Sequence, residues 1–332
     1  MLRAMLILVL FGITFSHSAL AQDQKGLDQK GQDQKGQDKQ GLDKQAKKKQ
    51  VVPSSPPTEA NVKYGDHERQ VLDFYKAESN TPTPVVFFIH GGGWQNGDKK
   101  GVGNVKQFLD KGISVAAINY RYVKQGVEMK IEPPVKAPIS DAARALQFVR
   151  SKAKDWNIDK KRIGATGGSA GACSSLWLAF HSDLADPKSE DPVARESTRL
   201  YCAAVNGAQT SLDPKELKDW IPNYGYGAHA FGLPNFASLM ENREKVLPWI
   251  QEYSPIEGVS KDDPPIGLYY SKQETPPVVG TTQKDPTHSG VMGIQLAKRL
   301  TEAGVEVVLV HQDSPNTKYP NSAAFLIAYL KK

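Results

Sequence analysis

The stretch RIGATGGSAG, residues 162–171, decides the fold because it passes from strand to helix through a turn of small residues. The residues from Arg162 to Gly167 predict a buried strand, and the segment from Ala170 to Phe180 predicts a helix. Strand, sharp turn and helix are the setting in which a GxSxG pattern indicates a reactive serine. We therefore predict that the turn holds Ser169 in a strained backbone conformation, with its hydroxyl beside the free N–H groups of the helix start.

The segments on either side repeat the alternation of strand and helix. Continuous apolar runs belong in a sheet that is covered on both faces, and strands that alternate with helices indicate a parallel sheet. The expected strands are Val85–Ile89, Ile113–Tyr120, Tyr201–Asn206, Ile266–Tyr270 and Val305–Val310, and the expected helices are Ser140–Lys154, Val291–Ala303 and a last one from Ala323. The predicted fold class is α/β, with a doubly wound, mostly parallel sheet.

One segment, from about Ala208 to Asp263, interrupts this alternation. Its periodicity is weak, and Pro, Gly, Asn and aromatic residues dominate it. We predict an inserted cap whose rings form a small core of their own, with stacking on an aryl or sugar ring of a ligand as the alternative. The rings are those of Trp220, Tyr224, Tyr226, Phe231, Phe236, Trp249 and Tyr253.

A second glycine-rich motif follows the expected strand Val85–Ile89. It reads His90-Gly91-Gly92-Gly93-Trp94. A loop of this type turns backbone N–H groups toward the oxyanion of a tetrahedral intermediate, and glycine leaves room for the acyl carbonyl to approach. We predict an oxyanion hole formed by the N–H groups of Gly91, Gly92 and Ala170.

With both motifs in order, the chain resembles the α/β-hydrolase family. Within it the chain is similar to the lipase and esterase branch that carries the HGGG loop, and to bacterial carbohydrate-esterase-like proteins. The resemblance covers roughly residues 60–332 and includes NYRY at 119–122 and the run SDAARALQFVRSKAKDWNIDKKRIGATGGSAG at 140–171. It implies hydrolysis of carboxylic esters of small acyl groups, without a cofactor.

The resemblance also implies a catalytic acid after the next-to-last strand. Two carboxylates compete for this role. Glu274 is nearer the end of the strand expected at 266–270, whereas Asp285 stands eleven residues before Leu296 of the following helix. We favour Asp285, because that spacing looks like the family's acid with an insertion before it.

The catalytic histidine of the family is expected several residues after the last strand, and no histidine stands there. The stretch 314–319 offers Lys318 and Tyr319, which are largely protonated at neutral pH and therefore poor bases. His288, three residues after Asp285, is the favoured base; the lack of any histidine base is the next alternative, and His311, at the end of the last strand, comes after it.

Two functions follow from these alternatives. The first is an exported serine ester hydrolase that acts on small-molecule or polysaccharide esters, such as acetyl or aryl esters of carbohydrates. The second is a catalytically degraded relative that binds esters or sugars. A degraded triad would still leave roughly 10³- to 10⁴-fold catalysis over water from the oxyanion hole and binding.

The chain begins with the features of an exported protein. Arg3, the apolar run from Ala4 to Phe15 and the small residues that follow predict a cleavable signal peptide over residues 1–21. The apolar run is shorter than the roughly 20 residues that a helix needs to span a bilayer, so no stable membrane span is expected. We expect a secreted or periplasmic protein.

Residues 22–60 repeat five-residue units such as DQKGQ and contain almost nothing apolar, which predicts a disordered linker before a hydrolase domain at 61–332. Eight lysines and five aspartates between residues 23 and 49 account for half of the formal net charge of +6. The folded part therefore offers little sequence support for a basic nucleic-acid site, and no nucleic-acid partner is expected.

The cysteines and histidines show no metal-ligand spacing such as CxxC or HExxH, so no metal is expected. Cys173 and Cys202 could pair in an oxidising compartment. Cys173 falls one turn into the helix expected from 170, and Cys202 falls at the start of the strand expected from 201. We favour two small buried residues over a disulfide.

Overall fold

The computed structural model describes residues 54–332, so the predicted signal peptide and most of the predicted linker lie outside the described residues. Within this range, no helix has the length and apolarity that crossing a membrane requires. The linker was expected to extend to residue 60, but residues 54–60 already bond to the domain. The Thr58 N–H donates to the Phe74 carbonyl at 2.8 Å, and the Lys106 N–H donates to Ser54 Oγ at 3.1 Å. An edge strand held by backbone hydrogen bonds needs few apolar residues, which explains the difference.

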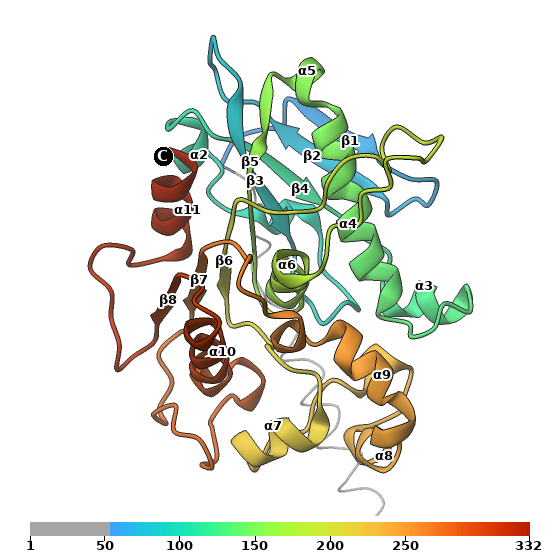
Figure 1. The fold of residues 1–332 in the computed structure, drawn as a ribbon, viewed down its shortest axis with the longest axis vertical. Coiled ribbons are helices and arrows are strands. Elements are labelled where there is room, and N and C mark those ends of the chain that lie inside the picture. Colours follow the sequence, from blue (N-terminus) through green and yellow to red (C-terminus); the bar gives the residue numbers. More distant parts are fainter. Residues whose placement is uncertain (1–53) are drawn as a thin grey trace, which may run out of the picture. The chain divides into compact units, whose positions relative to one another are not determined.

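An eight-stranded sheet in the order β1-β2-β4-β3-β5-β6-β7-β8 forms the centre of the described domain (Figure 1). From β4 to β8 all neighbours pair in parallel, whereas β2 is antiparallel to both β1 and β4. The predicted mostly parallel α/β sheet is therefore confirmed. The strands are β1 (Glu59–Lys63), β2 (Val71–Tyr75), β3 (Thr83–Ile89), β4 (Ser114–Ile118), β5 (Ile158–Gly167), β6 (Cys202–Asn206), β7 (Ile266–Tyr269) and β8 (Val307–Val310).

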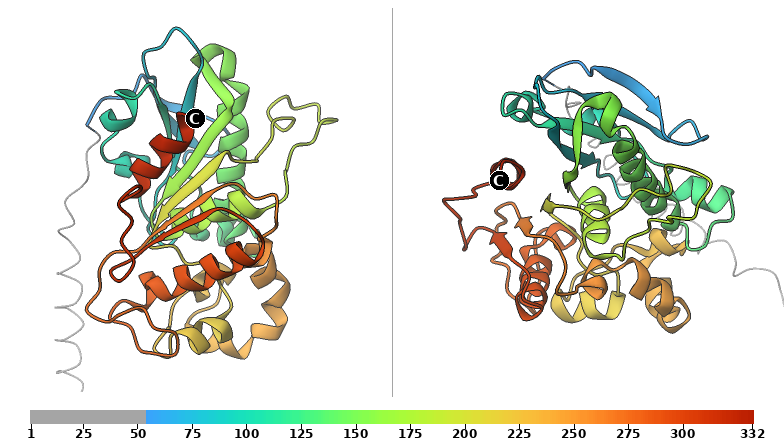
Figure 2. Two further views of the ribbon diagram at one scale, coloured as in Figure 1. Left: turned by 60° about the vertical axis from the view of Figure 1, so that its left-hand side comes forward. Right: turned by 45° about the horizontal axis from the view of Figure 1, so that its top comes forward.

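Helices cover both faces of the sheet (Figures 1 and 2). In β3, Val85 and Phe87 join the core beneath α4, α6 and α10, whereas Val86 joins the core beneath α2 and α11. Burial on both sides explains why the strand reads as a continuous apolar run. The helices are α2 (Lys106–Leu109), α3 (Val123–Glu128), α4 (Lys136–Ser151), α5 (Ala153–Trp156), α6 (Ala170–Phe180), α7 (Pro214–Trp220), α8 (Phe236–Glu241), α9 (Arg243–Tyr253), α10 (Gly290–Glu302) and α11 (Ser322–Leu330).

The structure adds elements that the sequence pattern did not predict, among them β1, β2 and α3. In β2, the apolar pattern is interrupted by Asp73, which is buried together with Lys99. Lys99 Nζ lies 3.0 Å from Asp73 Oδ2, so the buried charge is paired. A strand that contains one member of a buried ion pair cannot be predicted from its apolar residues alone.

The segment predicted as a cap lies between β6 and β7 and forms the short helices α7, α8 and α9. Figure 1 draws them below the carboxyl ends of the strands. Two pairs of its rings pack against each other: Phe231 stacks with Trp249 at a centroid distance of 6.5 Å, and Tyr224 meets Phe236 edge-on at 5.9 Å. Tyr253 stacks instead on Trp177 of α6 at 6.3 Å, so the rings do not all form a core of their own as predicted.

The two cysteines are both free and buried, Cys173 in α6 and Cys202 in β6. Burial raises the pKa of the Cys202 thiol to about 12. Both cysteines therefore behave as small core residues.

Candidate active site

The turn between β5 and α6 is strained and tightly packed. Ser169 has φ 54° and ψ −123°, a conformation that non-glycine residues seldom adopt. Its backbone N–H donates to the Asn206 carbonyl at 3.0 Å, which anchors the turn to β6. A Cβ at Gly167 or Gly171 would lie 2.4 or 2.1 Å from the Ile89 carbonyl oxygen, so neither position has room for a side chain. The strand, the turn and the helix are thus locked together around Ser169.

The HGGGW loop that follows β3 lies directly against this turn. A Cβ at Gly91 would be 2.6 Å from the Gly168 carbonyl oxygen and 3.5 Å from Ser169 Cβ. Three successive residues of the loop have positive φ: Gly92 at 102°, Gly93 at 63° and Trp94 at 56°. The buried Trp94 is held by a hydrogen bond of 2.9 Å from its indole N–H to Ser174 Oγ in α6.

The loop and the helix start bring free backbone donors to one place. Within the described part of the chain, the N–H groups of Gly91, Gly92 and Ala170 donate to no protein acceptor. Ala170 also begins α6, where unpaired N–H groups carry the positive end of the helix dipole. These are the three groups that the sequence proposes for an oxyanion hole, and the structure leaves them available.

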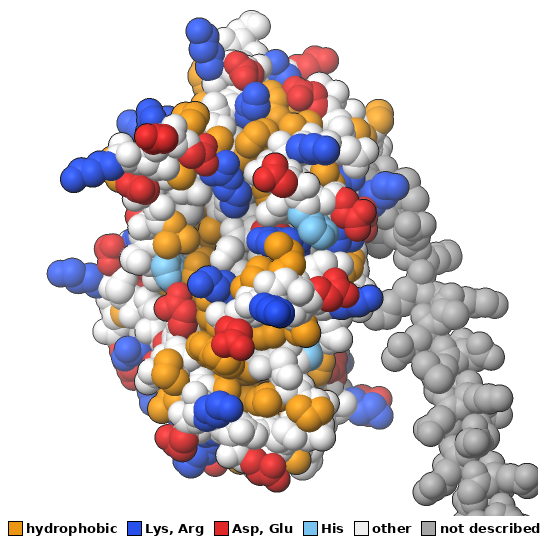
Figure 3. Space-filling view, turned by 90° about the vertical axis from the view of Figure 1, so that its right-hand side faces the viewer, with side chains coloured by type: hydrophobic (Ala, Val, Ile, Leu, Met, Phe, Trp, Pro, Cys, Tyr) orange, Lys and Arg blue, Asp and Glu red, His pale blue; other side chains and the backbone are white. Residues whose placement is uncertain are grey.

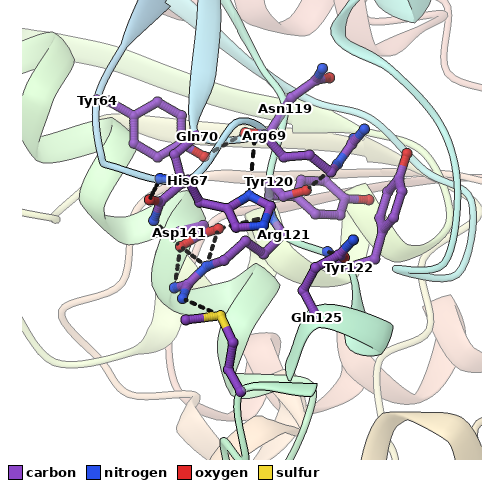
Figure 4. A network of polar contacts seen from close by, with 11 residues as sticks. Tyr64, His67, Arg69, Gln70, Asn119, Tyr120, Arg121, Tyr122, Gln125 and Asp141 are labelled. Carbon is purple, nitrogen blue, oxygen red and sulfur yellow. Dashed lines mark hydrogen bonds and ion pairs between the residues drawn. The ribbon is translucent and has the colours of Figure 1, made fainter. Parts of the chain in front are cut away.

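A polar network next to the loop fixes its conformation (Figure 4). Arg69 Nε donates to the Tyr120 carbonyl at 2.8 Å, and the guanidinium lies 3.7 Å from the centroid of the Tyr122 ring. Tyr122 Oη donates to the Gly97 carbonyl at 2.6 Å, and Tyr120 Oη donates to the His90 carbonyl at 2.8 Å. The NYRY stretch therefore braces both ends of the loop.

Arg121 and Asp141 extend this network to α4. Arg121 Nη2 lies 2.6 Å from Asp141 Oδ1, and Gln70 Nε2 donates to the same oxygen at 2.7 Å. Asp141 is almost fully buried, so its charge needs these partners. Sequence reasoning missed Arg69 and Asp141 as supports; the signal was present in the NYRY stretch and in the run at 140–171.

His90 belongs to the support of the loop. Its ring stacks on Tyr120 at a centroid distance of 4.1 Å, and Nδ1 lies 2.8 Å from the Gly91 carbonyl oxygen. Burial lowers the pKa of His90 to about 4, so the ring is uncharged at neutral pH. A neutral ring in this position packs without placing a charge beside the oxyanion donors.

The structure brings His288 and Asp285 to Ser169. His288 Nε2 lies 3.0 Å from Ser169 Oγ, and His288 Nδ1 lies 2.8 Å from Asp285 Oδ2. Asp285 caps the 3₁₀ turn Pro286–His288 between β7 and α10, and His288 is the last residue of that turn. The ring lies beside Gly207, whose φ is 57°, since a Cβ there would be 3.5 Å from His288 Cδ2.

The other candidates from the sequence lie elsewhere. Glu274 pairs with Lys284 at 3.5 Å, and both side chains are exposed. His311 Nδ1 accepts a hydrogen bond of 3.3 Å from the Asp313 backbone N–H. Tyr319 is buried and packs edge-on against Phe325 at 5.5 Å.

An open cleft of about 500 Å³ adjoins the acid and the base. The Asp285 and His288 side chains are 50% and 41% exposed, so this side of the site is in contact with solvent. Apart from Gly207, the residues that line the cleft are of polar or charged types. Its lining consists of Asn206, Gly207, Ser271, Lys272, Gln273, Glu274, Lys284, Asp285 and His288.

The segment predicted as a cap touches the opposite side of the site. A Cβ at Gly93 would be 2.2 Å from Tyr226 Oη, so the hydroxyl lies directly over the loop. His229 Nε2 lies 2.9 Å from the Gly93 carbonyl oxygen. Burial lowers the pKa of His229, which favours a neutral ring that donates to this carbonyl. No pattern in the sequence singled out Tyr226 or His229 for this contact.

This sheet order, with a strained serine turn after β5 and a Ser–His–Asp chain of hydrogen bonds, defines an α/β-hydrolase. The profile of the BD-FAE family matches residues 72–285, which is more than half of the chain. The chain belongs to the BD-FAE family.

Curated relatives are esterases of several kinds. The probable isoprenylcysteine alpha-carbonyl methylesterase ICMEL1 of Arabidopsis thaliana is 29% identical over 206 residues, which cover 60% of this chain and 39% of the relative. The probable carboxylic ester hydrolase LipM of Mycobacterium tuberculosis is 26% identical over 228 residues, covering 65% and 48%. This chain therefore spans less than half the length of these relatives.

Solved structures support the fold. A truncated form of a carbohydrate esterase from gut microbiota superposes with a TM-score of 0.63 at 21% identity, covering 84% of this chain and all of that one. An acetyl ester-xyloside bifunctional hydrolase from Caldicellulosiruptor lactoaceticus superposes with a TM-score of 0.55 at 22% identity, covering 79% and 86%. At these identities, the likeness concerns the fold alone.

Proposed function

We propose that this protein is an exported serine carboxylesterase that acts on acetyl or aryl esters of carbohydrates. The observation that carries the proposal is the unbroken chain of hydrogen bonds from Asp285 through His288 to Ser169. A serine, a base within hydrogen-bond reach and a third group that orients the base form the arrangement of an activated nucleophile.

The proposed reaction uses these groups in sequence. Ser169 Oγ attacks the ester carbonyl carbon while its proton passes to His288 Nε2. The N–H groups of Gly91, Gly92 and Ala170 donate to the oxyanion that forms. His288 then gives the proton to the departing alcohol, leaving an acyl group on Ser169. A water molecule repeats the sequence on the acyl-enzyme, which releases the carboxylic acid and restores the serine.

Asp285 has an orienting role in this proposal. Its carboxylate accepts a hydrogen bond of 2.8 Å from the Nδ1–H group of His288, which leaves Nε2 with a free lone pair toward Ser169. The carboxylate also favours the imidazolium that forms during the attack.

The substrate class rests on weaker support than the reaction. The names of the curated relatives point to carboxylic esters, and the two solved structures named above include carbohydrate esterases. The side chains that line the cleft beside His288 offer hydrogen-bonding groups to a hydroxyl-rich alcohol. On the face in Figure 3, side chains of both charges are interspersed, and a nucleic-acid partner is no part of the proposal.

The alternative of a degraded binding protein depended on the lack of a base after the last strand. His288 stands at hydrogen-bond distance from Ser169 although it comes from a different loop. No observation in the described residues favours the binding protein over the esterase.

Hydrolysis of p-nitrophenyl acetate tests the reaction. The wild type should turn over, and Ser169→Ala and His288→Ala should each lose at least about 10³-fold in kcat. His311→Ala is the matched control, a histidine at the end of β8 that should keep full activity. Equal rates for the wild type and Ser169→Ala would refute the proposal. Release of acetate from acetylated xylan tests the substrate class in parallel.

Export is tested separately. Expression of the full chain in a Gram-negative host, followed by fractionation and N-terminal sequencing, should give a protein outside the cytoplasm that begins at Gln22. Recovery of an uncut chain in the cytoplasm would contradict the export part and leave the reaction untouched.

A further inference from the structure

The side chain of Gln273 makes three hydrogen bonds to the turn that carries Asp285 and His288. Its side-chain amide nitrogen donates to the Asp285 carbonyl at 3.2 Å and to the His288 carbonyl at 3.0 Å. Its side-chain oxygen accepts from the Asp285 backbone N–H at 3.2 Å. One amide group thus forms hydrogen bonds with both Asp285 and His288.

Gln273 is itself fixed from the other side. Its backbone N–H donates to Gln312 Oε1 at 2.8 Å. Gln312 follows β8, in the connection where the family resemblance places a catalytic histidine. In this chain the connection supplies a support for the loop that carries the base.

The turn needs such a support because little else restrains it. Pro286–His288 is a single 3₁₀ turn, and hydrogen bonds of this helix type have poor geometry. The Asp285 and His288 side chains are about half exposed, so close packing cannot hold them. The Thr287 carbonyl accepts one further bond, of 2.6 Å, from Gln209 Nε2.

We propose that Gln273 is a positioning residue that sets the distance and orientation of the Asp285–His288 pair relative to Ser169. The inference rests on the proposed function. Displacing a catalytic group by about 1 Å costs on the order of 10²-fold in rate. The amide of Gln273 prevents that displacement by tying the first and last residues of the turn to one rigid plane.

The experiment compares Gln273→Met, which keeps the length of the side chain and removes its three bonds to the turn, with Gln251→Met. Gln251 is an exposed residue of α9 and serves as the matched control. We expect Gln273→Met to lower kcat about 10- to 100-fold with KM within twofold, and the control to leave both unchanged. A raised KM with unchanged kcat would make Gln273 a substrate contact in the cleft and overturn the proposal.

A double-mutant cycle shows whether Gln273 acts through the base. In a His288→Ala background there is no imidazole to position, so Gln273→Met should reduce the residual kcat less than threefold. An undiminished loss in that background would overturn the proposal, because Gln273 would then act by another route.

A readout without turnover separates this inference from the proposed function. Long-range ¹H–¹⁵N NMR reports the tautomer of His288, which a bond from Nδ1 to Asp285 fixes with the proton on Nδ1. Gln273→Met should shift His288 toward a mixture of tautomers, and Gln251→Met should not. An unchanged tautomer together with unchanged kcat would refute the role of Gln273. A wild type that shows the fixed tautomer but no Ser169-dependent hydrolysis would instead refute the esterase.

Discussion

The two halves of the candidate site are held in different ways. The half that contains Ser169 and the HGGGW loop lies at the ends of β3 and β5, has several residues at positive φ and leaves no room for a side chain at Gly167 or Gly171. The half that contains Asp285 and His288 lies on an exposed connection and is held by side-chain hydrogen bonds such as those of Gln273. The first half is fixed by packing and the second by a few polar contacts.

The difference shows which groups of such a site can be supplied by different loops. Backbone donors at a strand end depend on the sheet itself, so they stay with β3 and β5. A base needs only to bring one ring nitrogen to the serine. Here it comes from the connection between β7 and α10, three residues after the acid, rather than from the one after β8.

The largest effect should come from the exposed half. Asp285→Asn should lower kcat by about 10³- to 10⁴-fold, because an amide cannot hold the imidazole in the tautomer that accepts the serine proton. Steady-state kinetics on p-nitrophenyl acetate measures this, and thermal unfolding should show little change for so exposed a side chain. Unaltered kcat would show that the Asp285–His288 bond has no part in the reaction.

In the buried half, Gly171→Ala should act on stability first. The new Cβ would lie 2.1 Å from the Ile89 carbonyl oxygen, and neither backbone can yield without disturbing the sheet. We expect a loss of about 3 to 4 kcal/mol in the free energy of unfolding, measured with denaturant. Gly225→Ala is the control, because an added Cβ there meets nothing within 4 Å. Equal stabilities for the two variants would contradict the tight packing of the turn.

The buried half should also respond to acid. The pKa of His90 is lowered to about 4 in the fold by burial, against about 6.5 in the unfolded chain. The unfolded state therefore binds the proton more readily, so stability is lost as the pH falls from about 6.5 to about 4, by up to about 3 kcal/mol. His90→Asn should be less stable at pH 7 but flatter over this range. Denaturant unfolding at pH 7, 5.5 and 4.5 measures the slopes, and parallel slopes would contradict the assignment.

The smallest effect should come from the rejected acid. Glu274→Gln removes an exposed ion pair with Lys284 and leaves the Asp285–His288 bond intact. Exposed pairs contribute about 0 to 1 kcal/mol, so the free energy of unfolding should change by less than about 1 kcal/mol and kcat by less than about twofold. A loss of kcat comparable with that of Asp285→Asn would make Glu274 the orienting acid instead.

The sheet and the packed half of the site could be predicted from short stretches of sequence. The small residues of the RIGATGGSAG stretch and the HGGGW loop indicate tight turns with unusual backbone angles. The serine turn and the loop beside it therefore follow from local steric rules. The same patterns miss β2, because its buried Asp73 is paired with a lysine from another segment.

The exposed half could be predicted only as a choice between residues. The sequence favours His288 over His311 only because His288 stands three residues after Asp285. In the structure, the two differ because the 271–289 connection folds back beside Gly207 and brings His288 to the site. That path depends on Gln273, Gln312 and Gln209, whose contacts join segments far apart in the chain. No periodicity in the sequence indicates such contacts, so only the three-dimensional structure identifies which histidine lies next to Ser169.

Asp285 and His288 both lie on the connection between β7 and α10. The connection between β8 and α11 therefore carries neither the candidate acid nor the candidate base. Residues 313–315 there are exposed, whereas Tyr319 farther along is packed into the core. Surface loops of this kind accept insertions with little cost to the fold. A peptide tag or a small binding module grafted at Pro315 would thus leave the connection that carries Asp285 and His288 uninterrupted. This gives the scaffold an attachment point for an added module.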